Sequence, residues 1–283
     1  MTKTIAIIQA RMAASRLPDK VLLDIGGFPM LSWVVERTRR AKFVDKIIVA
    51  TTTDSSDDSV ATFCSDRGYI VTRGSVHDVL DRYYQSAKRY APDTIVRITA
   101  DCPLLDPALV DQTIDTLQNP QISIANDQPT GFDFSTNRLP LPWGRTYPIG
   151  LDVEAFTWSA LQRAWHESVK THQREHVTPL FYEDIPVEKL SFRNNKTSLA
   201  IATSPQEFRV ALLHYKRDYG HLRWTVDTPE DLSFVRQVIS RLDNKTEFTW
   251  LDVLQLLQRE PELISINADI QHKTHLDVDT RSH

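Results

Sequence analysis

Cysteine is scarce in this chain, with only Cys64 and Cys102 among 283 residues. Two cysteines cannot form a dense disulfide framework, and neither stands in a metal-binding spacing, so a reducing setting is expected. Long hydrophobic runs are also missing. The first apolar run, Ile5–Ile8, resembles no signal peptide, and no run approaches the ~18 residues that read as a membrane span. The sequence therefore predicts a soluble, cytoplasmic protein with no membrane partner.

An excess of positive charge is absent too. The chain has 33 lysine and arginine residues against 37 acidic ones, a net charge of −4 and a pI near 6.1. Proteins that bind nucleic acids or membrane surfaces usually show clustered basic excess, so small-molecule partners are expected and nucleic acid is not. The first strand-to-helix turn has no glycine triad of the dinucleotide-binding type, and this disfavours an NAD-dependent oxidoreductase.

The first half of the chain alternates short β-branched runs with helical periodicity. Such alternation predicts an α/β fold with a doubly wound, mostly parallel sheet and ligands at the carboxyl ends of its strands. Ser75 with Asp78, and Asp106 before Pro107, are typical helix starts. The expected strands are 4–9, 46–51, 69–72 and 94–99, and the expected helices are 29–42, 57–67, 76–91 and 107–118.

Proline and glycine interrupt the pattern over 119–150, a stretch too long to be a plain connection. We interpret it as a loop-rich insertion that covers substrate or forms a dimer. One domain is expected over 1–265, with 119–195 as the insertion and acceptor region, and 266–283 as a mobile tail. Beyond the loop we expect strands at 151–156, near 187–193 and at 222–226, and helices at 158–168, about 172–183, 229–242 and 249–259.

A cationic loop follows the first predicted strand and carries Arg11, Arg16 and Lys20. Unit cations about 4 Å apart repel by about 4 kcal/mol near a protein surface, so cations that converge need an anion, and a nucleotide triphosphate suits them. The small residues around them allow backbone N–H groups to approach phosphate oxygens. The alternative is that the three cations face water. The nucleotide contacts expected here are Gln9, Ala10, Arg11, Ser15, Arg16 and Lys20.

Two aspartates end predicted strands, Asp101 after 94–99 and Asp227 after 222–226. Magnesium is normally held by one or two carboxylates together with substrate phosphates and water. The pair therefore predicts a Mg²⁺ site opposite the cationic loop. The alternative is structural, because Asp227 could cap the helix at Pro229 and Asp101 could brace the next loop.

A further strand-to-helix turn places Arg73 beside Gly74. Arg73 is suited to donate to O2 and N3 of a pyrimidine, which favours cytosine, and Gly74 permits close approach of the base. The competing interpretation is an ordinary surface ion pair between Arg73 and Asp78 or Asp81.

Polar residues downstream of the insertion are candidates for an acceptor pocket, namely Asp152, Glu154, Glu175 and His176. His176 as a general base competes with a packing or hydrogen-bonding role, which is commoner for a single histidine in a helical pattern. The three tail histidines show no metal-binding spacing and are expected to be solvated.

Several segments in one order carry a family resemblance. They are 7–20 (IIQARMAASRLPDK), 73–83 (RGSVHDVLDRY), 97–104 (RITADCPL), 150–154 (GLDVE), 174–179 (REHVTP) and 224–231 (WTVDTPED). Together they resemble the spore-coat polysaccharide F-like branch of the cytidylyltransferases, which is related to the CMP-keto-deoxy-octulosonate and CMP-sialate synthetases. The resemblance implies a nucleotide-diphospho-sugar transferase (Rossmann-like) fold, CTP as co-substrate, Mg²⁺ as cofactor and a homodimer. It also implies that Arg11, Arg16 and Lys20 hold the triphosphate and that Asp101 and Asp227 bind the metal.

Some positions depart from the family pattern. Gln9 stands where the octulosonate and sialate enzymes have proline, and Asp19, Ala100 and Ile149 stand where this branch often has glycine. Thr225 takes the place of a second acidic residue of the sialate enzymes, which predicts fewer protein ligands and more water around the metal.

The function expected from all this is transfer of CMP from CTP to an acidic sugar or phosphorylated small molecule, with release of pyrophosphate, in surface polysaccharide or glycoconjugate biosynthesis. The expected catalytic residues are Arg11, Lys20, Asp101 and Asp227. The rivals are a non-catalytic nucleotide-sugar-binding protein, and uridylyl or guanylyl transfer on the same fold.

Overall fold

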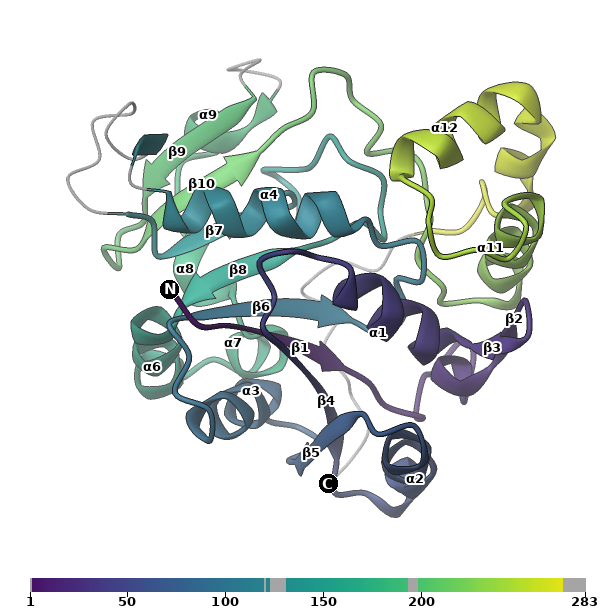
Figure 1. Ribbon diagram of the computed structural model, residues 1–283. Helices are drawn as coiled ribbons and strands as arrows, with labels where there is room; N and C mark the ends of the chain where they lie inside the picture. The colour runs from purple at the N-terminus through teal and green to yellow at the C-terminus, as the bar shows by residue number, and fades with distance from the viewer. Residues whose placement is uncertain (1, 120, 123–130, 193–197, 272–283) are drawn as a thin grey trace.

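The computed structural model describes residues 2–119, 121–122, 131–192 and 198–271, and its centre is one eight-stranded sheet (Figure 1). The strand order is β5-β4-β1-β6-β8-β7-β10-β9, and the first four of these strands are mutually parallel. β8 runs antiparallel to both of its neighbours, while β10 is parallel to β7 and antiparallel to β9. The strands are β1 (Thr4–Gln9), β4 (Lys46–Thr52), β5 (Ile70–Gly74), β6 (Thr94–Thr99), β7 (Phe134–Thr136), β8 (Glu154–Thr157), β9 (Leu199–Thr203) and β10 (Arg209–Leu213).

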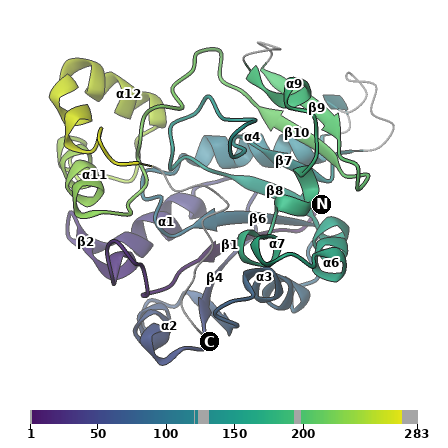
Figure 2. The same cartoon turned by 180° about the vertical axis from the view of Figure 1, so that it is seen from behind.

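Helices cover both faces of this sheet. Figure 1 faces α1 (Met30–Arg39) and α4 (Pro107–Gln118), and Figure 2, from behind, faces α6 (Trp158–Glu167) and α7 (Thr171–His176). The buried apolar residues accordingly form two clusters, one on each side of the sheet. Strands that are buried on both faces carry continuous apolar runs, as β1 does. The doubly wound, mostly parallel arrangement predicted from the sequence is confirmed.

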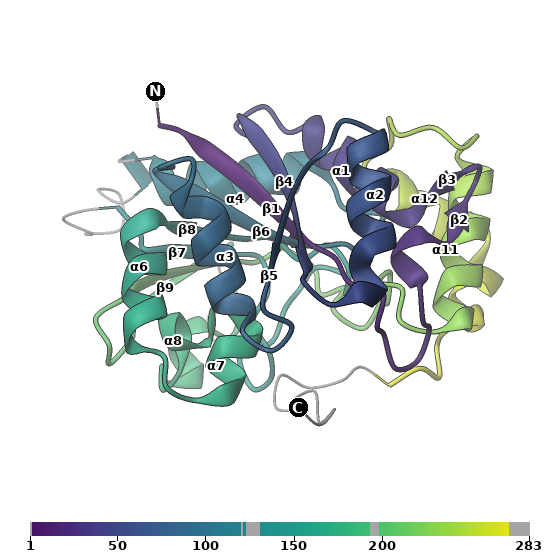
Figure 3. The same ribbon diagram turned by 90° about the horizontal axis from the view of Figure 1, so that it is seen from below.

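The remaining helices divide between the two faces. α3 (Val79–Lys88) and α8 (Pro179–Tyr182) contribute to the same cluster as α6, whereas α2 (Asp58–Asp66), α11 (Pro229–Arg241) and α12 (Trp250–Arg259) belong with α1 (Figure 3). Outside the main sheet, β2 (Asp24–Ile25) pairs with β3 (Phe28–Pro29). Short 3₁₀ turns stand at Lys20–Leu22 (η1), Ser55–Asp57 (η2) and Pro261–Ile266 (η3).

One predicted helix start is confirmed and the other is wrong. The Asp106 carboxylate accepts from the Ala108 N–H, with Pro107 as the first residue of α4. α3, in contrast, begins at Val79 and not at residue 76, because Asp78 is its N-cap and accepts from the Asp81 N–H. Ser75 instead accepts from the Asp78 N–H in the preceding turn.

The second half of the chain departs further from the expected elements. The segment expected as a strand near 187–193 forms the helix α9 (Val187–Leu190), and residue 193 lies outside the described residues. The helix expected at about 172–183 is split into α7 and α8, because Val177 adopts a φ of 71° and Pro179 cannot continue the hydrogen-bond ladder of α7. The strand expected at 222–226 is an irregular extended segment with a single bridge between Arg223 and Ile149.

The predicted insertion 119–195 contributes to the main sheet, since β8 and β7 lie between β6 and β10. β7, β9 and β10 were not expected. The tail predicted at 266–283 is described only to residue 271, and its three histidines lie outside the described residues. Among the described residues, no helix combines the length and the hydrophobicity needed to cross a bilayer.

Candidate active site

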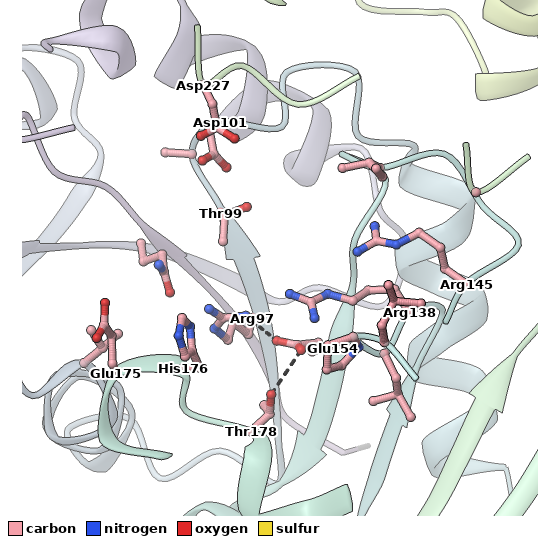
Figure 4. A pocket seen from close by; sticks show the side chains of 18 of the residues that line it. Arg97, Thr99, Asp101, Arg138, Arg145, Glu154, Glu175, His176, Thr178 and Asp227 are labelled. Atoms are coloured by element: carbon pink, nitrogen blue, oxygen red, sulfur yellow. Dashed lines mark hydrogen bonds and ion pairs between the residues drawn. The ribbon is translucent and has the colours of Figure 1, made fainter. Parts of the chain in front are cut away.

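A cleft of about 990 Å³ opens beside the carboxyl ends of β1 and β6. The cationic loop, the end of β6, the segment 138–149 and the region of α7 and α8 line it. Figure 4 shows Asp101 and Asp227 at one end, and Arg97, Glu154 and Thr178 at the other. Most of the predicted site residues line this cleft, namely Gln9, Ala10, Arg11, Ser15, Arg16, Lys20, Asp101, Glu154, Glu175, His176 and Asp227.

Buried hydrogen bonds shape the cationic loop between β1 and η1. The Met12 N–H donates to Asp57 Oδ1 at 2.7 Å, and the Met12 carbonyl accepts from the Asp19 N–H at 3.0 Å. Asp57 is 1% exposed, and its other oxygen accepts from the Thr52 N–H. Asp19 has φ 60° and ψ 9°, a left-handed conformation that glycine adopts most readily and aspartate tolerates. The family branch that the sequence resembles often has glycine at this position, and the Asp19 backbone has the conformation that glycine adopts readily.

Lys20 joins the two predicted metal-binding aspartates. Its Nζ lies 2.8 Å from Asp101 Oδ2 and 2.8 Å from Asp227 Oδ1, and it also donates to the Val226 carbonyl at 2.8 Å. An ammonium group has three donors, so these contacts use all of them. Burial lowers the pKa of Lys20, but the two carboxylates outweigh this effect and the pKa is raised. Lys20 is thus a buried cation that holds two carboxylates 126 positions apart in one place.

Two arginines also contact Asp227. Its Oδ2 lies 2.9 Å from Arg16 Nη2 and 2.8 Å from Arg223 Nη2. Burial alone raises the pKa of Asp227, yet Lys20 and Arg223 hold it well below its usual range. The alternative that Asp227 caps the following helix does not hold, because the N-cap of α11 is Thr228, in a capping box with Asp231.

The chemistry of the carboxylate pair suits a divalent cation. Lys20 already lies 2.8 Å from one oxygen of each carboxylate, and Arg16 and Arg223 pair with the second Asp227 oxygen, so a bound cation would replace some of these contacts. Carboxylate oxygens are the protein ligands that Mg²⁺ prefers, and it commonly takes one or two of them with phosphates and water. No cluster of three or more acidic, histidine or cysteine side chains suited to a metal occurs in the described ranges. An ion between Asp101 and Asp227 would therefore draw its other ligands from nucleotide and solvent.

At the other end of the cleft, Figure 4 shows the guanidinium groups of Arg97, Arg138 and Arg145 near Glu154, and Asp152 pairs with two of these arginines. Arg97 pairs with Glu154, whose second oxygen accepts from Thr178 Oγ1 at 3.0 Å. Asp152 pairs with Arg145 and lies 3.2 Å from Arg138 Nε. Burial lowers the pKa of Arg97, but Glu154 outweighs this and raises it. The group has three cations and two anions, so it carries one net positive charge.

Three predicted site residues do not line the cleft, although one of them, Asp152, pairs with the lining residues Arg138 and Arg145. Arg73, Gly74 and Asp152 are not among the residues that line the cleft, within the part of the chain that the structure describes. Arg73 donates to the carbonyls of Thr52 and Asp54 and lies 2.7 Å from Asp58 Oδ1. It therefore makes a surface ion pair, as the competing interpretation held, although with a different carboxylate. The role of Arg73 in reading the base stays a prediction that this arrangement does not favour.

Sequence reasoning missed several residues of the site. Asp57 is the first residue of the predicted helix 57–67, where an acidic residue is common and gives no signal of its own. Arg223 interrupts the predicted strand 222–226, and that charge was a usable signal. Arg97 lies within the apolar run of β6, and its charge in a buried strand was a usable signal. Arg82, which is 3% exposed, also lines the cleft. Burial lowers its pKa to about 10.

Comparison with known proteins decides the family. The family model described as cytidylyltransferase matches residues 5–238. This chain belongs to the cytidylyltransferase family. It is 27% identical over 266 residues to the spore coat polysaccharide biosynthesis protein SpsF of Bacillus subtilis, covering 93% of this chain and 97% of that one.

Two further relatives are informative. The chain is 28% identical to a 3-deoxy-manno-octulosonate cytidylyltransferase of Geobacter sulfurreducens, covering 81% of this chain and 96% of that one. A solved cytidylyltransferase structure from Leptospira borgpetersenii matches with a TM-score of 0.77 and 30% identity, covering 96% of this chain and all of that one. The suspected family and its fold are therefore confirmed, and the chain is a nucleotidyltransferase.

Proposed function

We propose that this cytidylyltransferase transfers CMP from CTP to an acidic sugar and releases pyrophosphate, in the synthesis of a surface polysaccharide or glycoconjugate. One observation carries the proposal. The cationic loop after β1 and the aspartates Asp101 and Asp227 lie in a single cleft, joined through Lys20. This arrangement supports a phosphate-binding role for the cations and a metal-binding role for the carboxylates.

In this reaction the protein positions the two substrates and stabilises the negative charge of the phosphate groups. The acceptor oxygen attacks the α-phosphorus of CTP in line, a P–O bond forms to it, and the P–O bond to pyrophosphate breaks. Asp101 and Asp227 would hold Mg²⁺, which would supply positive charge at the phosphate oxygens. Arg11 and Arg16 offset the negative charge of the triphosphate and of the departing pyrophosphate. Lys20 keeps the two carboxylates together against their mutual repulsion.

The arginine-rich end of the cleft supports an acidic acceptor. Arg97, Arg138 and Arg145 carry one charge more than Glu154 and Asp152 neutralise, and a buried positive excess favours an anionic ligand. The predicted acceptor residues Glu154 and Asp152 then act mainly by orienting these arginines. The relative named for 3-deoxy-manno-octulosonate supports a sugar acid, and the relative named for spore coat polysaccharide biosynthesis supports a polysaccharide product.

The test is pyrophosphate release from the full chain with Mg²⁺ and each of four nucleoside triphosphates. The acceptor panel pairs anionic compounds, such as 3-deoxy-manno-octulosonate, sialate and sugar phosphates, with neutral sugars of similar size. Acceptor-dependent release with CTP and an anionic sugar supports the proposal. Release with UTP or GTP in preference to CTP, or with neutral sugars only, contradicts it.

Variants test the site itself. Asp101→Asn is expected to fold normally and to lose most turnover, because a neutral amide binds a divalent cation far less well than a carboxylate. Asp66→Asn, an exposed carboxylate on α2, is the matched control and is expected to retain activity. Near-native turnover by Asp101→Asn with CTP and Mg²⁺ would show that the proposed mechanism is wrong.

A further inference from the structure

The end of the described chain lies against the residues that hold Asp227. After η3, the Asn267 side chain is 5% exposed, and its Nδ2 donates to Asp231 Oδ1 at 2.9 Å and to the Arg223 carbonyl at 3.0 Å. Four residues on, the Gln271 carbonyl accepts from Arg16 Nη1 at 3.2 Å. The C-terminal segment thus contacts both of the arginines that pair with Asp227.

Arg223 and Asp231 form a two-pronged ion pair beneath Asp227. Arg223 Nε lies 2.9 Å from Asp231 Oδ1, and Arg223 Nη2 lies 2.9 Å from Asp231 Oδ2. The same Nη2 donates to Asp227 Oδ2 at 2.8 Å. The Asp231 side chain is fully buried, and that of Arg223 is 5% exposed. The fork fixes where the Arg223 guanidinium lies, and therefore where it holds the Asp227 carboxylate.

Asp231 also fixes the backbone at Asp227. Its Oδ2 accepts from the Asp227 N–H at 3.0 Å and from the Thr228 N–H at 3.1 Å. Capping of α11 explains the bond to Thr228. It does not require a buried arginine or a buried asparagine from a segment 36 positions further along the chain. Burying charged groups costs free energy of desolvation, so capping of α11 alone does not explain why Arg223 and Asp231 are buried.

We propose that Arg223, Asp231 and Asn267 are positioning residues that fix the Asp227 carboxylate for a divalent cation, so that the C-terminal segment helps to build the active site. The inference rests on the proposed role of Asp227 as a metal ligand. Partners that orient a metal ligand typically change metal affinity about 10- to 100-fold when they are replaced. Asn267 touches neither the metal position nor the nucleotide loop, so its effect would be transmitted through Asp231 and Arg223.

The experiment measures Mn²⁺ binding to the full chain in the presence of CTP by electron paramagnetic resonance. Asn267→Leu keeps the branching and the number of side-chain heavy atoms but removes both N–H donors, and Ser265→Ala, an exposed change in the same segment, is the matched control. Arg223→Lys keeps the charge but cannot bridge both carboxylates in the same fork, and it provides a second variant should Asn267→Leu fail to fold. Both Asn267→Leu and Arg223→Lys are expected to weaken Mn²⁺ binding about tenfold or more.

Metal-free CTP binding and the melting temperature are measured alongside. A purely structural role would lower the melting temperature and leave the Mn²⁺ affinity of the folded protein unchanged, and that result overturns the inference. Asp227→Asn distinguishes a failure of the proposed metal site from a failure of the positioning role. If it does not weaken Mn²⁺ binding, the metal assignment in the proposed function fails. If it does, and the other two variants do not, only the positioning role fails.

Discussion

The buried ion pair between Arg97 and Glu154 offers the sharpest test of the proposed acceptor site in the cleft. The perturbation is Glu154→Gln, which keeps the size of the side chain and removes its charge. Arg97 is 8% exposed and Glu154 3%. Losing one partner of such a pair leaves an uncompensated buried charge and costs about 3–5 kcal/mol of unfolding free energy. Arg138 and Arg145 nearby add to that cost, because the group then has three cations and a single anion.

An exposed pair in the same protein provides the comparison. Arg163 and Glu167 lie one helical turn apart on α6 and are 41% and 44% exposed. Pairs of this kind contribute about 0.3–0.5 kcal/mol, so Glu167→Gln is expected to be nearly neutral. The assay is urea-induced unfolding of both variants at pH 7. A third variant with both Arg97→Met and Glu154→Leu is expected to recover most of the stability, since replacing a whole buried pair with apolar side chains is often neutral.

Activity provides an independent measurement on the same variant. Glu154→Gln is expected to raise the KM for the acidic acceptor, because Arg97 loses the partner that orients it. The KM for CTP should not change, because the cationic loop, where we propose that CTP binds, lies at the other end of the cleft. The reasoning is refuted if Glu154→Gln is no more destabilising than Glu167→Gln, or if the KM for CTP rises and that for the acceptor does not.

Three other predictions follow from the same structure. Gly150→Ala is expected to destabilise the protein severely, because at φ +102° the added Cβ would lie 2.5 Å from the Thr225 nitrogen, whereas Gly68→Ala, with open space at φ +68°, should cost only about 1–2 kcal/mol in thermal or urea unfolding. Asp57→Asn is expected to raise the KM for CTP about tenfold, since bonds from backbone N–H groups to a charged group are worth about 1.5–3 kcal/mol, while unchanged CTP kinetics would show that Asp57 does not shape the loop. The pKa of Asp227 is lowered in the folded protein from its ordinary value of 3.8, so its stabilising effect is present above that value and is lost as pH falls through the folded pKa. Unfolding of wild type and Asp227→Asn across pH 2–7 should therefore show a stability difference that shrinks in acid, and a constant difference would contradict this.

The parallel half of the fold could be predicted because local pattern and tertiary environment agree there. β1, β4 and β6 are buried on both faces and carry continuous β-branched runs, and α4 begins at a typical cap and proline. The rest depends on contacts that the local sequence does not encode. The apolar run 222–226 looks like a strand, but its Val226 N–H bonds to the Asp101 carbonyl and not to a neighbouring strand. β7 has only three residues and is defined by its partners.

The candidate site shows the same division. The loop after β1 and Asp101 were predicted because they follow true strand ends, where ligands bind in folds of this kind, whereas Asp227 was predicted from 222–226, which is an irregular segment. The arginines at the other end of the cleft come from β6 and from the irregular segment 138–145, and no spacing rule connects them. Arg73 stood at a strand end as well, yet nearby carbonyls and Asp58 hold it outside the cleft. A strand-end position therefore indicates the right edge of the sheet but not the direction of a long side chain.

β6 sets the distance between the two ends of the cleft. Arg97, Thr99 and Asp101 alternate along the strand and its continuation, and Figure 4 shows them following one another along the cleft. At about 3.3 Å per residue, Arg97 and Thr99 are separated by about 7 Å of strand, and Asp101 follows in the turn where the Cys102 N–H donates to the Thr99 carbonyl. The strand and the turn after it thus fix the spacing between Asp101 and the guanidinium group of Arg97. Inserting a single residue into β6 would turn one of these side chains to the opposite face of the sheet. The number of residues between them is therefore constrained by the substrate that the cleft binds.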